Sequence, residues 1–490
     1  MAEDLKKETA KGVIWSSIEK FGTQGINFLV NIILARLLLP ADFGLIAMCT
    51  VFLQISQTII DCGFSNALIQ RKDRNETDFS TVFWFNLGLS FLLYGILFVA
   101  APWISDFYHA PELTGILRLL CVILILGAIG SVHQTRLYIN LQFKRLAIVS
   151  SVSSIVSGGV AIWMAYAGRG GVAIWMASAG RGVWSLVWMS LIKIFLISVL
   201  LIFAARWWPK KPFSMAAFRR LFSYSSRLLG ANLIHQIFYN LYTIVIGKFY
   251  SQRQLGYFNR AELFARFPSQ TLSLVVGRVA FPVLSRMQDD NERLARAYSK
   301  YITYSSALIF PVMAAVVGLA EPLVIFLLTD KWLPIVPLLR ILSLAWVTDH
   351  LCNINLNMLY VKGRTDLALR IEILKKGVAT LFLILTMKHG LAAICWGFAA
   401  YSLFSIAATA YYSRPLIGLS IWRQMRDYLP IFLLASVAGG GAWLLTMVVP
   451  GAGWQLLTGL LVGAAAYLLM IRFFQRPIWE EAVSLLRRRS

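Results

Sequence analysis

Fourteen apolar stretches of about twenty residues, separated by short polar breaks, follow one another along most of this 490-residue chain. A helix rises ~1.5 Å per residue, so each stretch is long enough to cross the ~30 Å hydrocarbon core of a bilayer. Because 58% of the residues are hydrophobic and only 14% are charged, one soluble core could not bury the apolar surface. The sequence therefore predicts an all-α integral membrane protein with about 14 transmembrane helices.

The basic residues indicate the orientation of the chain. Most of the 46 Lys and Arg residues fall at the two ends of the chain and in the loops after the even-numbered spans. Cytoplasmic loops are rich in Lys and Arg, so we expect a multi-pass protein with both termini in the cytoplasm. The net charge of +23 then reflects membrane topology, and we expect no nucleic-acid partner.

A repeated pattern divides the chain into two halves. Arg36 precedes Gly44 by eight residues, and Lys248 precedes Gly256 by the same eight residues, 212 positions further along. Duplication of this kind is typical of membrane transporters. We expect two pseudo-symmetric six-helix bundles plus a C-terminal helix pair. The expected segments are an N-terminal bundle (1–205), a basic cytoplasmic linker (206–224), a C-terminal bundle (225–412), and the helix pair with a basic cytoplasmic tail (413–490).

A tandem copy of twelve residues follows the fifth predicted span. GVAIWMAYAGRG at 159–170 is repeated as GVAIWMASAGRG at 171–182. Twelve helical residues extend about 18 Å, so both copies cannot simply lengthen one span. We expect the first copy to complete the span, and the second to form an external loop or to extend the next helix.

Ionisable residues inside the predicted spans are candidates for function. At bilayer depth each costs roughly 2.5–3.5 kcal/mol unless it faces protein or water. Lys20, Arg227, Arg266 and Arg278 fall well inside the first, seventh and eighth spans, which are therefore expected to line a wet path. The candidates for ion coupling are Glu19, Asp61, His235, Asp349 and His350.

Sequence patterns of enzymes are missing from this chain. It has no Walker A, HExxH, CxxC or GxSxG pattern in a plausible setting, and no large external loop that could carry a catalytic domain. We therefore expect no enzyme activity, no cofactor and no bound metal, and any transport would depend on an ion gradient, the membrane potential or the substrate gradient.

Three stretches carry a resemblance to a known family. They are WSSIEKFGTQGINFLVNIILARLLLPADFGLIAM at 15–48, GFSNALIQ at 63–70, and IGKFYSQRQLGYFNRAELFARFP at 246–268. With fourteen spans and cytoplasmic termini, the chain resembles the polysaccharide transporter branch of the MOP exporter superfamily. Within that branch it is most similar to the Wzx-type lipid-linked oligosaccharide flippases, particularly the colanic acid exporter WzxC group.

The resemblance implies a substrate and a mechanism. The substrate would be an undecaprenyl-diphosphate-linked oligosaccharide repeat unit for exopolysaccharide or lipopolysaccharide biosynthesis. It would move from the cytoplasmic to the periplasmic leaflet of a bacterial inner membrane by alternating access, coupled to an ion gradient or the membrane potential. Partners would be membrane lipids and the polysaccharide polymerase and export machinery.

Two groups of residues suit such a substrate. Guanidinium groups make charge-assisted hydrogen bonds to phosphate and stay protonated. The candidates for the diphosphate are Arg227, Arg266, Arg278, Lys20 and Arg340. Polar and aromatic side chains could meet the sugar, although each could equally join two helices. These sugar-contact candidates are Asn27, Asn31, Gln236, Tyr239 and Asn240.

One alternative is a multidrug or small-cation antiporter on the same fold. Such a protein would need acidic cavity residues, and embedded basic residues outnumber embedded acids here. A second alternative, a membrane polymerase or ligase, would need a large external catalytic loop.

Overall fold

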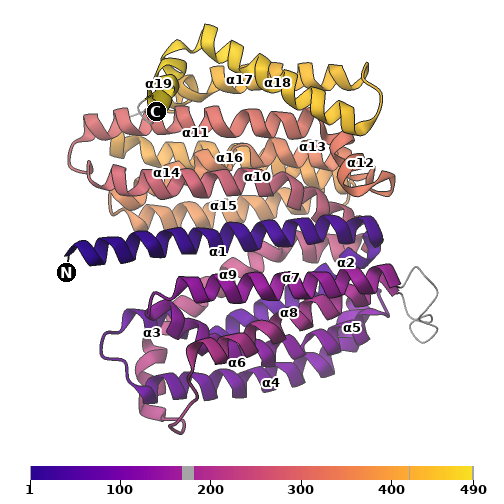
Figure 1. Cartoon of the computed structure of the whole chain (residues 1–490), viewed down its shortest axis with the longest axis vertical. Helices are drawn as coiled ribbons and strands as arrows, with labels where there is room; N and C mark the ends of the chain where they lie inside the picture. Colours follow the sequence, from indigo (N-terminus) through magenta and orange to yellow (C-terminus); the bar gives the residue numbers. More distant parts are fainter. Residues whose placement is uncertain (1, 168–180, 419, 488–490) are drawn as a thin grey trace. The chain divides into compact units, whose positions relative to one another are not determined.

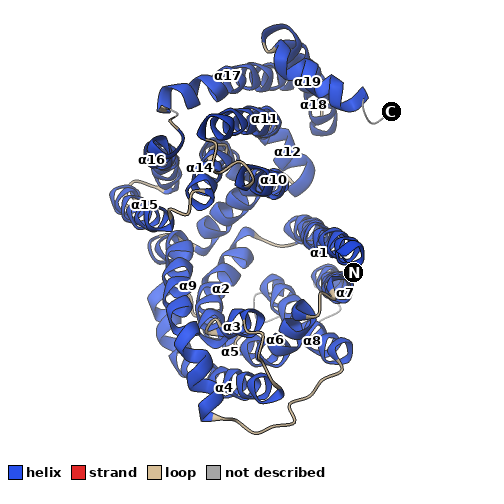
Figure 2. Ribbon diagram, turned by 90° about the vertical axis from the view of Figure 1, so that its left-hand side faces the viewer, coloured by secondary structure: helices blue, strands red, loops and turns tan. Residues whose placement is uncertain are grey.

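The computed structural model describes residues 2–167, 181–418 and 420–487. Within these ranges the chain consists of helices and connecting loops and has no β-strand (Figures 1 and 2). The described chain separates into two compact units, Met1–Gly256 and Tyr257–Ser490, called unit 1 and unit 2 below.

Unit 1 is a bundle of long helices with two short helical segments. It comprises α1 (Ala2–Leu37), α2 (Pro40–Asp61), α3 (Phe64–Gln70), α4 (Glu76–Tyr108), α5 (Leu113–Leu120), α6 (Val122–Ile139), α7 (Phe143–Ala167), α8 (Arg181–Ala205) and α9 (Met215–Phe249). Helix α7 packs along both α1 and α8, α6 packs on α4 and α8, and α9 packs on α2, α3 and α4. The space enclosed by α2, α6, α8 and α9 contains the cavity described below.

Unit 2 holds the remaining helices. They are α10 (Gln252–Ser285, which begins in unit 1), α11 (Asn291–Gly318), α12 (Ala320–Leu328), the 3₁₀ turn η2 (Asp330–Trp332), α13 (Ile335–Trp346), α14 (Asp349–Val361), α15 (Thr365–Thr386), α16 (Leu391–Ile417), α17 (Ile421–Thr446), α18 (Ala452–Phe474) and α19 (Arg476–Arg487). Helix α17 packs along α11 and α18, and α16 packs on α13, α14 and α15. Buried Tyr298, Phe310 and Met313 of α11 belong to an apolar cluster that this helix shares with α14, α17 and α18.

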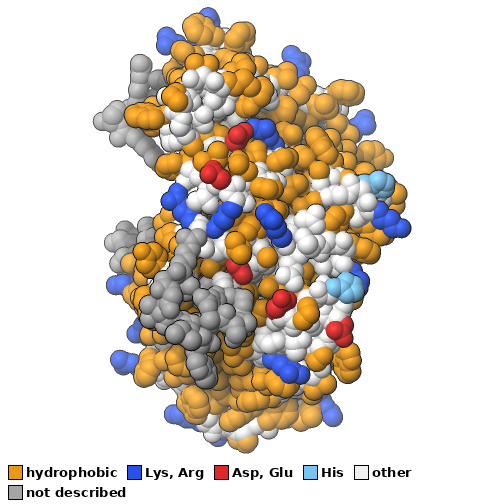
Figure 3. All heavy atoms as spheres, turned by 90° about the vertical axis from the view of Figure 1, so that its right-hand side faces the viewer, with side chains coloured by type: hydrophobic (Ala, Val, Ile, Leu, Met, Phe, Trp, Pro, Cys, Tyr) orange, Lys and Arg blue, Asp and Glu red, His pale blue; other side chains and the backbone are white. Residues whose placement is uncertain are grey.

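Ten helical segments in the described part are long and apolar enough to cross a membrane. Apolar side chains also form broad areas on the face shown in Figure 3. The predicted all-α membrane fold is therefore confirmed, whereas the count of fourteen spans is not. Four long helices, α1, α9, α10 and α15, are not among the ten. They are among the helices that carry the embedded polar and charged residues of the sequence.

Side-chain caps fix where several helices begin. The Asn75 side chain accepts from the Asp78 backbone N–H (3.0 Å), and the Asp78 carboxylate accepts from the Asn75 N–H (3.1 Å), so a reciprocal capping box starts α4. Ser214 caps α9 by accepting from the Ala217 N–H. This cap explains why α9 begins at Met215, ten residues before the predicted start at residue 225.

The segment before α9 is tied to α4. The Trp84 indole donates to the Lys211 carbonyl (3.2 Å), and the backbone N–H groups of Lys211 and Ser214 donate to hydroxyls of α4. Buried Trp207 packs with Phe79 and Phe83 of the same helix. In this structure the 206–224 segment and α9 both belong to unit 1. The division of the chain at a 206–224 linker stays a prediction.

Two glycines allow the starts of α2 and α10 to touch through their backbones. A β-carbon on Gly44 would lie 1.9 Å from the carbonyl oxygen of Gln252, and one on Gly256 would lie 1.8 Å from that of Pro40. Only glycine fits at such an approach. Gln252 and Gly256 stand 212 positions after Pro40 and Gly44, so the repeated pattern makes the same contact twice.

The tandem copy is described only in part. The first copy, up to Ala167, continues α7 as expected. Most of the second copy lies outside the described residues, and its last two residues, Arg181 and Gly182, begin α8.

Candidate functional site

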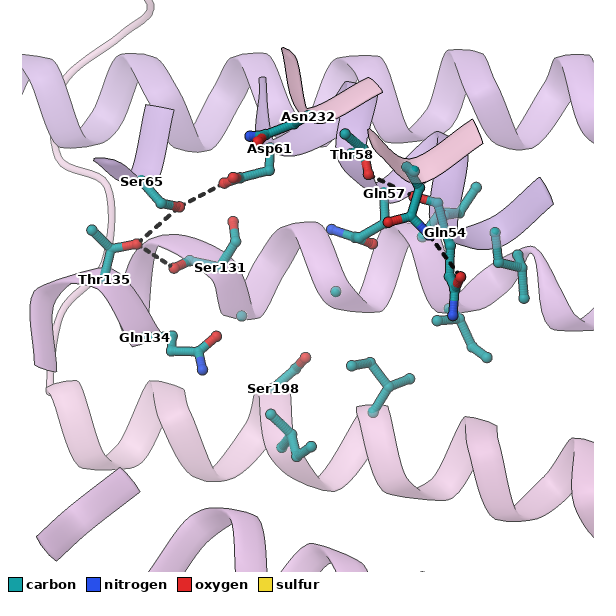
Figure 4. A pocket seen from close by; sticks show the side chains of 18 of the residues that line it. Gln54, Gln57, Thr58, Asp61, Ser65, Ser131, Gln134, Thr135, Ser198 and Asn232 are labelled. Atoms are coloured by element: carbon teal, nitrogen blue, oxygen red, sulfur yellow. Dashed lines mark hydrogen bonds between the residues drawn. The ribbon is translucent and has the colours of Figure 1, made fainter. Parts of the chain in front are cut away.

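A cavity of about 960 Å³ lies inside unit 1 (Figure 4). Helices α2, α6, α8 and α9 form most of its wall, with contributions from α3 and α5. Its polar lining consists of amides, hydroxyls, one carboxylate and one imidazole. Of the residues that the structure describes, no Lys or Arg lines it. The volume is at the upper end of the range for ligand sites, about 300–1,000 Å³.

Helix α2 supplies a polar stripe to this cavity. The stripe consists of Thr50, Gln54, Gln57, Thr58 and Asp61. Their spacing of three or four residues places them on one face of the helix. Other positions of the helix are apolar and packed, with Met48, Cys49 and Val51 almost fully buried. The stripe is visible in the sequence, but we did not predict it because only Asp61 is charged.

An amide network joins α2 to α9 across the cavity. The Gln54 side-chain oxygen accepts from the Gln236 amide (2.7 Å) and from the Asn240 amide (3.0 Å). Asn240 also donates to the Gln236 carbonyl (2.9 Å) and is only 6% exposed. Gln236 and Tyr239 line the cavity, whereas Asn240 lies behind it and is not a lining residue. Three of the predicted sugar-contact residues are thus brought together, and their role stays a prediction.

A second network surrounds the one carboxylate of the lining. Ser65 donates to Asp61 Oδ1 at 2.6 Å, and the Thr135 hydroxyl lies 3.2 Å from the Ser65 hydroxyl (Figure 4). No Lys or Arg side chain in the described part forms an ion pair with Asp61. His235, the other ion-coupling candidate here, also lines the cavity and stacks on Tyr239 at a centroid distance of 6.2 Å.

The other ion-coupling candidates lie elsewhere. Asp349 of unit 2 accepts from Asn353 (3.0 Å). His350 is buried, with one ring nitrogen 3.1 Å from the Ser306 hydroxyl and the other 2.9 Å from the Val347 carbonyl. Because protein groups contact both of its nitrogens, His350 fits a packing role. The side chain of Glu19 lies outside the described residues.

The predicted diphosphate residues fall into two groups. The side chains of Lys20, Arg227 and Arg278 lie outside those described. Arg266 of α10 pairs with Glu262 (3.5 Å) and lies over the Trp346 ring. Arg340 of α13 donates to the Val317 carbonyl (3.3 Å) and lines a smaller, mostly apolar cavity of about 370 Å³ within unit 2.

Two predicted sugar contacts belong to a different arrangement. Asn27 of α1 accepts a hydrogen bond from the ammonium of Lys193 on α8 (3.0 Å). Asn31 donates to the backbone carbonyl of Asn27 (2.8 Å). Neither asparagine lines the 960 Å³ cavity. Lys193 lies within the candidate span Gly182–Ala205, and its contact with Asn27 is visible only in the structure.

Comparisons with known proteins agree with the fold. A family model described as polysaccharide biosynthesis protein matches residues 33–174 and 170–337. The teichuronic acid biosynthesis protein TuaB of Bacillus subtilis is 26% identical over 442 residues, which cover 89% of this chain and 88% of TuaB. The lipopolysaccharide biosynthesis protein WzxC of Escherichia coli is 20% identical over 450 residues, covering 89% and 88%.

Solved structures share the same architecture. The lipid II flippase MurJ in an inward closed conformation superposes with a TM-score of 0.75 at 14% identity, covering 95% of this chain and 99% of that one. An inward-facing multidrug resistance transporter of the MATE family, in the MOP superfamily, gives a TM-score of 0.57 at 17% identity, covering 81% and 96%. At these identities the likeness establishes the fold.

Proposed function

Because this chain belongs to the polysaccharide biosynthesis protein family, we propose that it is a flippase for undecaprenyl-diphosphate-linked oligosaccharide repeat units. It carries them from the cytoplasmic to the periplasmic leaflet of a bacterial inner membrane, with both termini in the cytoplasm. The work is transport and not catalysis. Relatives named for teichuronic acid and lipopolysaccharide biosynthesis support a saccharide cargo, and the MurJ-like fold supports a lipid-linked one.

The observation that carries the proposal is the lining of the unit 1 cavity. Amide and hydroxyl groups both donate and accept, which matches the hydroxyls and ring oxygens of a sugar. Gln57, Gln134 and Asn232 offer such groups to the cavity, and Tyr239 adds an aromatic ring to its lining. A cavity of about 960 Å³ has room for more than one sugar residue. In this proposal the sugar of the substrate binds in this cavity and its lipid tail stays in the membrane.

The diphosphate needs cationic partners, because it must leave water to cross the membrane. Lys20, Arg227, Arg266, Arg278 and Arg340 remain proposed contacts. Of these, Arg266 is already paired with Glu262, which reduces its attraction for another anion. Asp61 and His235 are the proposed ion-coupling groups, because both are titratable and both line the cavity.

A second candidate function is a multidrug or small-cation antiporter. It is favoured by one observation: among the described lining residues, Asp61 is the one Asp, Glu, Lys or Arg. An isolated carboxylate in a cavity attracts a cation. The predominance of neutral amides and hydroxyls in the lining favours the saccharide.

Deletion of the gene in its own bacterium separates the two candidates. The flippase proposal expects undecaprenyl-diphosphate-linked oligosaccharide to accumulate on the cytoplasmic leaflet and surface polysaccharide to disappear. Plasmid-borne wild-type protein should restore both. An unchanged lipid pool together with altered sensitivity to cationic drugs would refute the flippase and support the antiporter.

A further inference from the structure

Lys193 occupies an unusual position for a charged residue. It lies near the middle of the candidate span Gly182–Ala205, which is the most apolar of the ten. A lysine near the end of a span reaches the headgroups with its own side chain, but one near the middle does not. The ammonium must therefore be stabilised by protein, water or a ligand.

The protein supplies one neutral partner. Lys193 Nζ donates to Asn27 Oδ1 at 3.0 Å. An ammonium has three N–H donors, and no carboxylate in the described part of the chain pairs with this one. A structural lysine at this depth would be expected to pair with an acid. The amide orients the ammonium without neutralising it.

The position of Lys193 on α8 places it beside the cavity. Ser190 and Ile197, three residues before and four residues after Lys193, both line the cavity. Residues at these spacings are neighbours on a helix surface. Lys193 is half-buried and its ammonium points toward α1, so it borders the cavity without lining it.

We propose that Lys193, oriented by Asn27, binds a phosphate oxygen of the transported lipid. This inference rests on the proposed function and adds to it an anion position that lies between α1 and α8. A lysine ammonium is a compact charge with rotatable N–H donors on a flexible side chain. It can therefore keep contact with a phosphate oxygen while the phosphate changes orientation during transport. The sugar occupies the cavity lined by amides and hydroxyls, and its phosphate meets the ammonium at the cavity border.

The test is a binding titration with the full-length protein. The protein is placed in nanodiscs of zwitterionic phosphatidylcholine, so that no anionic lipid competes. The probes are undecaprenyl diphosphate without sugar and the uncharged undecaprenol, followed by intrinsic tryptophan fluorescence. Lys193→Met should weaken diphosphate binding by about tenfold or more, because a charge-assisted contact is lost. Lys193→Arg should retain binding to within a few fold, and undecaprenol binding should not change.

The outcomes separate this inference from the proposed function. If the wild-type protein binds both probes equally, the flippase proposal itself fails. If the wild type prefers the diphosphate and Lys193→Met keeps the full preference, the flippase proposal stands and the Lys193 assignment is wrong.

Thermal stability distinguishes binding from a purely structural link between α1 and α8. Removing an embedded charge relieves its desolvation, so Lys193→Met should be at least as heat-stable as the wild type. A structural link would instead make Lys193→Met and Asn27→Leu equally less stable, with normal binding by the protein that remains folded.

A cysteine variant covers the case in which Lys193→Met does not insert. All five native cysteines are buried and free. Lys193→Cys is treated with 2-aminoethyl methanethiosulfonate, which restores a cation, or with the neutral ethyl reagent. Recovery of diphosphate binding with the first reagent alone supports the assignment, and equal binding after both reagents overturns it.

Discussion

The carbonyl oxygen of Gln252 lies 1.9 Å from the position that a β-carbon on Gly44 would take. The reciprocal contact, Pro40 with Gly256, differs by 0.1 Å, and its residues are those related by the 212-residue repeat. Backbone contacts of this kind leave no room for a side chain to adjust. The repeated glycines therefore mark a helix crossing that both copies preserve.

Gly44→Ala should destabilise the protein markedly. The new methyl group would collide with backbone, and overpacking in a well-packed site costs typically about 1–3 kcal/mol. Gly25→Ala is the matched control, because no heavy atom lies within 4 Å of the place its methyl group would take. Thermal unfolding in detergent should show a lower Tm for Gly44→Ala and no loss for Gly25→Ala. Equal unfolding temperatures would mean that the crossing is loose.

Gln54→Ala should lower stability through the amide network. It removes the acceptor that the Gln236 and Asn240 amides share, and each hydrogen bond lost is worth about 0.5–1.5 kcal/mol net. Gln134→Ala is the control: Gln134 lines the same cavity, and its side chain has no hydrogen-bond partner within the described part. The control should keep its Tm and lose transport. A drop in Tm for both variants would count against a specific role for the network.

Asp61→Asn should uncouple transport from the ion gradient. The amide oxygen still accepts from Ser65, so the local geometry is kept while the charge is lost. Proteoliposomes with an imposed proton or sodium gradient provide the measurement. Wild-type transport should respond to one gradient and the variant to neither. Ser65→Ala, which keeps the carboxylate, should still respond; a coupled Asp61→Asn would rule out this residue as the coupling group.

The contacts of Glu481 with Tyr304 and Lys300 should make the attachment of α19 to α11 depend on pH. The Tyr304 hydroxyl donates to this carboxylate and Lys300 lies 3.3 Å from it, and together they hold the pKa of Glu481 below its ordinary value. A lowered pKa means that the stabilisation is present above the ordinary value of about 4.3 and is lost as the pH falls through the folded-state value.

Limited proteolysis of α19 measures this attachment. Cleavage should increase in acid for the wild type, while Glu481→Gln should be cleaved more readily at neutral pH and change less with acid. Glu480→Gln is the control, because the neighbouring carboxylate has no ion pair among the described residues. A wild-type cleavage rate that does not vary with pH would contradict the prediction.

Much of the fold could be predicted from the sequence because membrane spans depend on length and apolarity, which are local properties. The same dependence on apolarity explains why some of the long helices could not be assigned as membrane spans from the sequence. Helices α1, α9, α10 and α15 carry polar and charged side chains, so hydropathy alone does not identify them as spans. The start of α9 also differs from the predicted one, because Ser214 caps the helix within the predicted 206–224 linker.

The site was less accessible to prediction. Embedded charges drew attention to lysines and arginines, yet the described lining of the large cavity is neutral except for Asp61 and His235. Gln54 and Gln57 could have been found by their spacing on one face of α2. The contact between Lys193 and Asn27 could not, because it joins residues 166 positions apart and depends on how α1 and α8 are packed.

The amides and hydroxyls that line the cavity also determine how long the proposed saccharide would stay bound. Each hydrogen bond to an amide or hydroxyl replaces one to water, and its net worth is only about 0.5–1.5 kcal/mol. A saccharide bound in this way would have a short residence time, because no single contact contributes a large free energy of binding. A cavity that bound the proposed saccharide tightly would retain it, whereas a lining of amides and hydroxyls would favour its release.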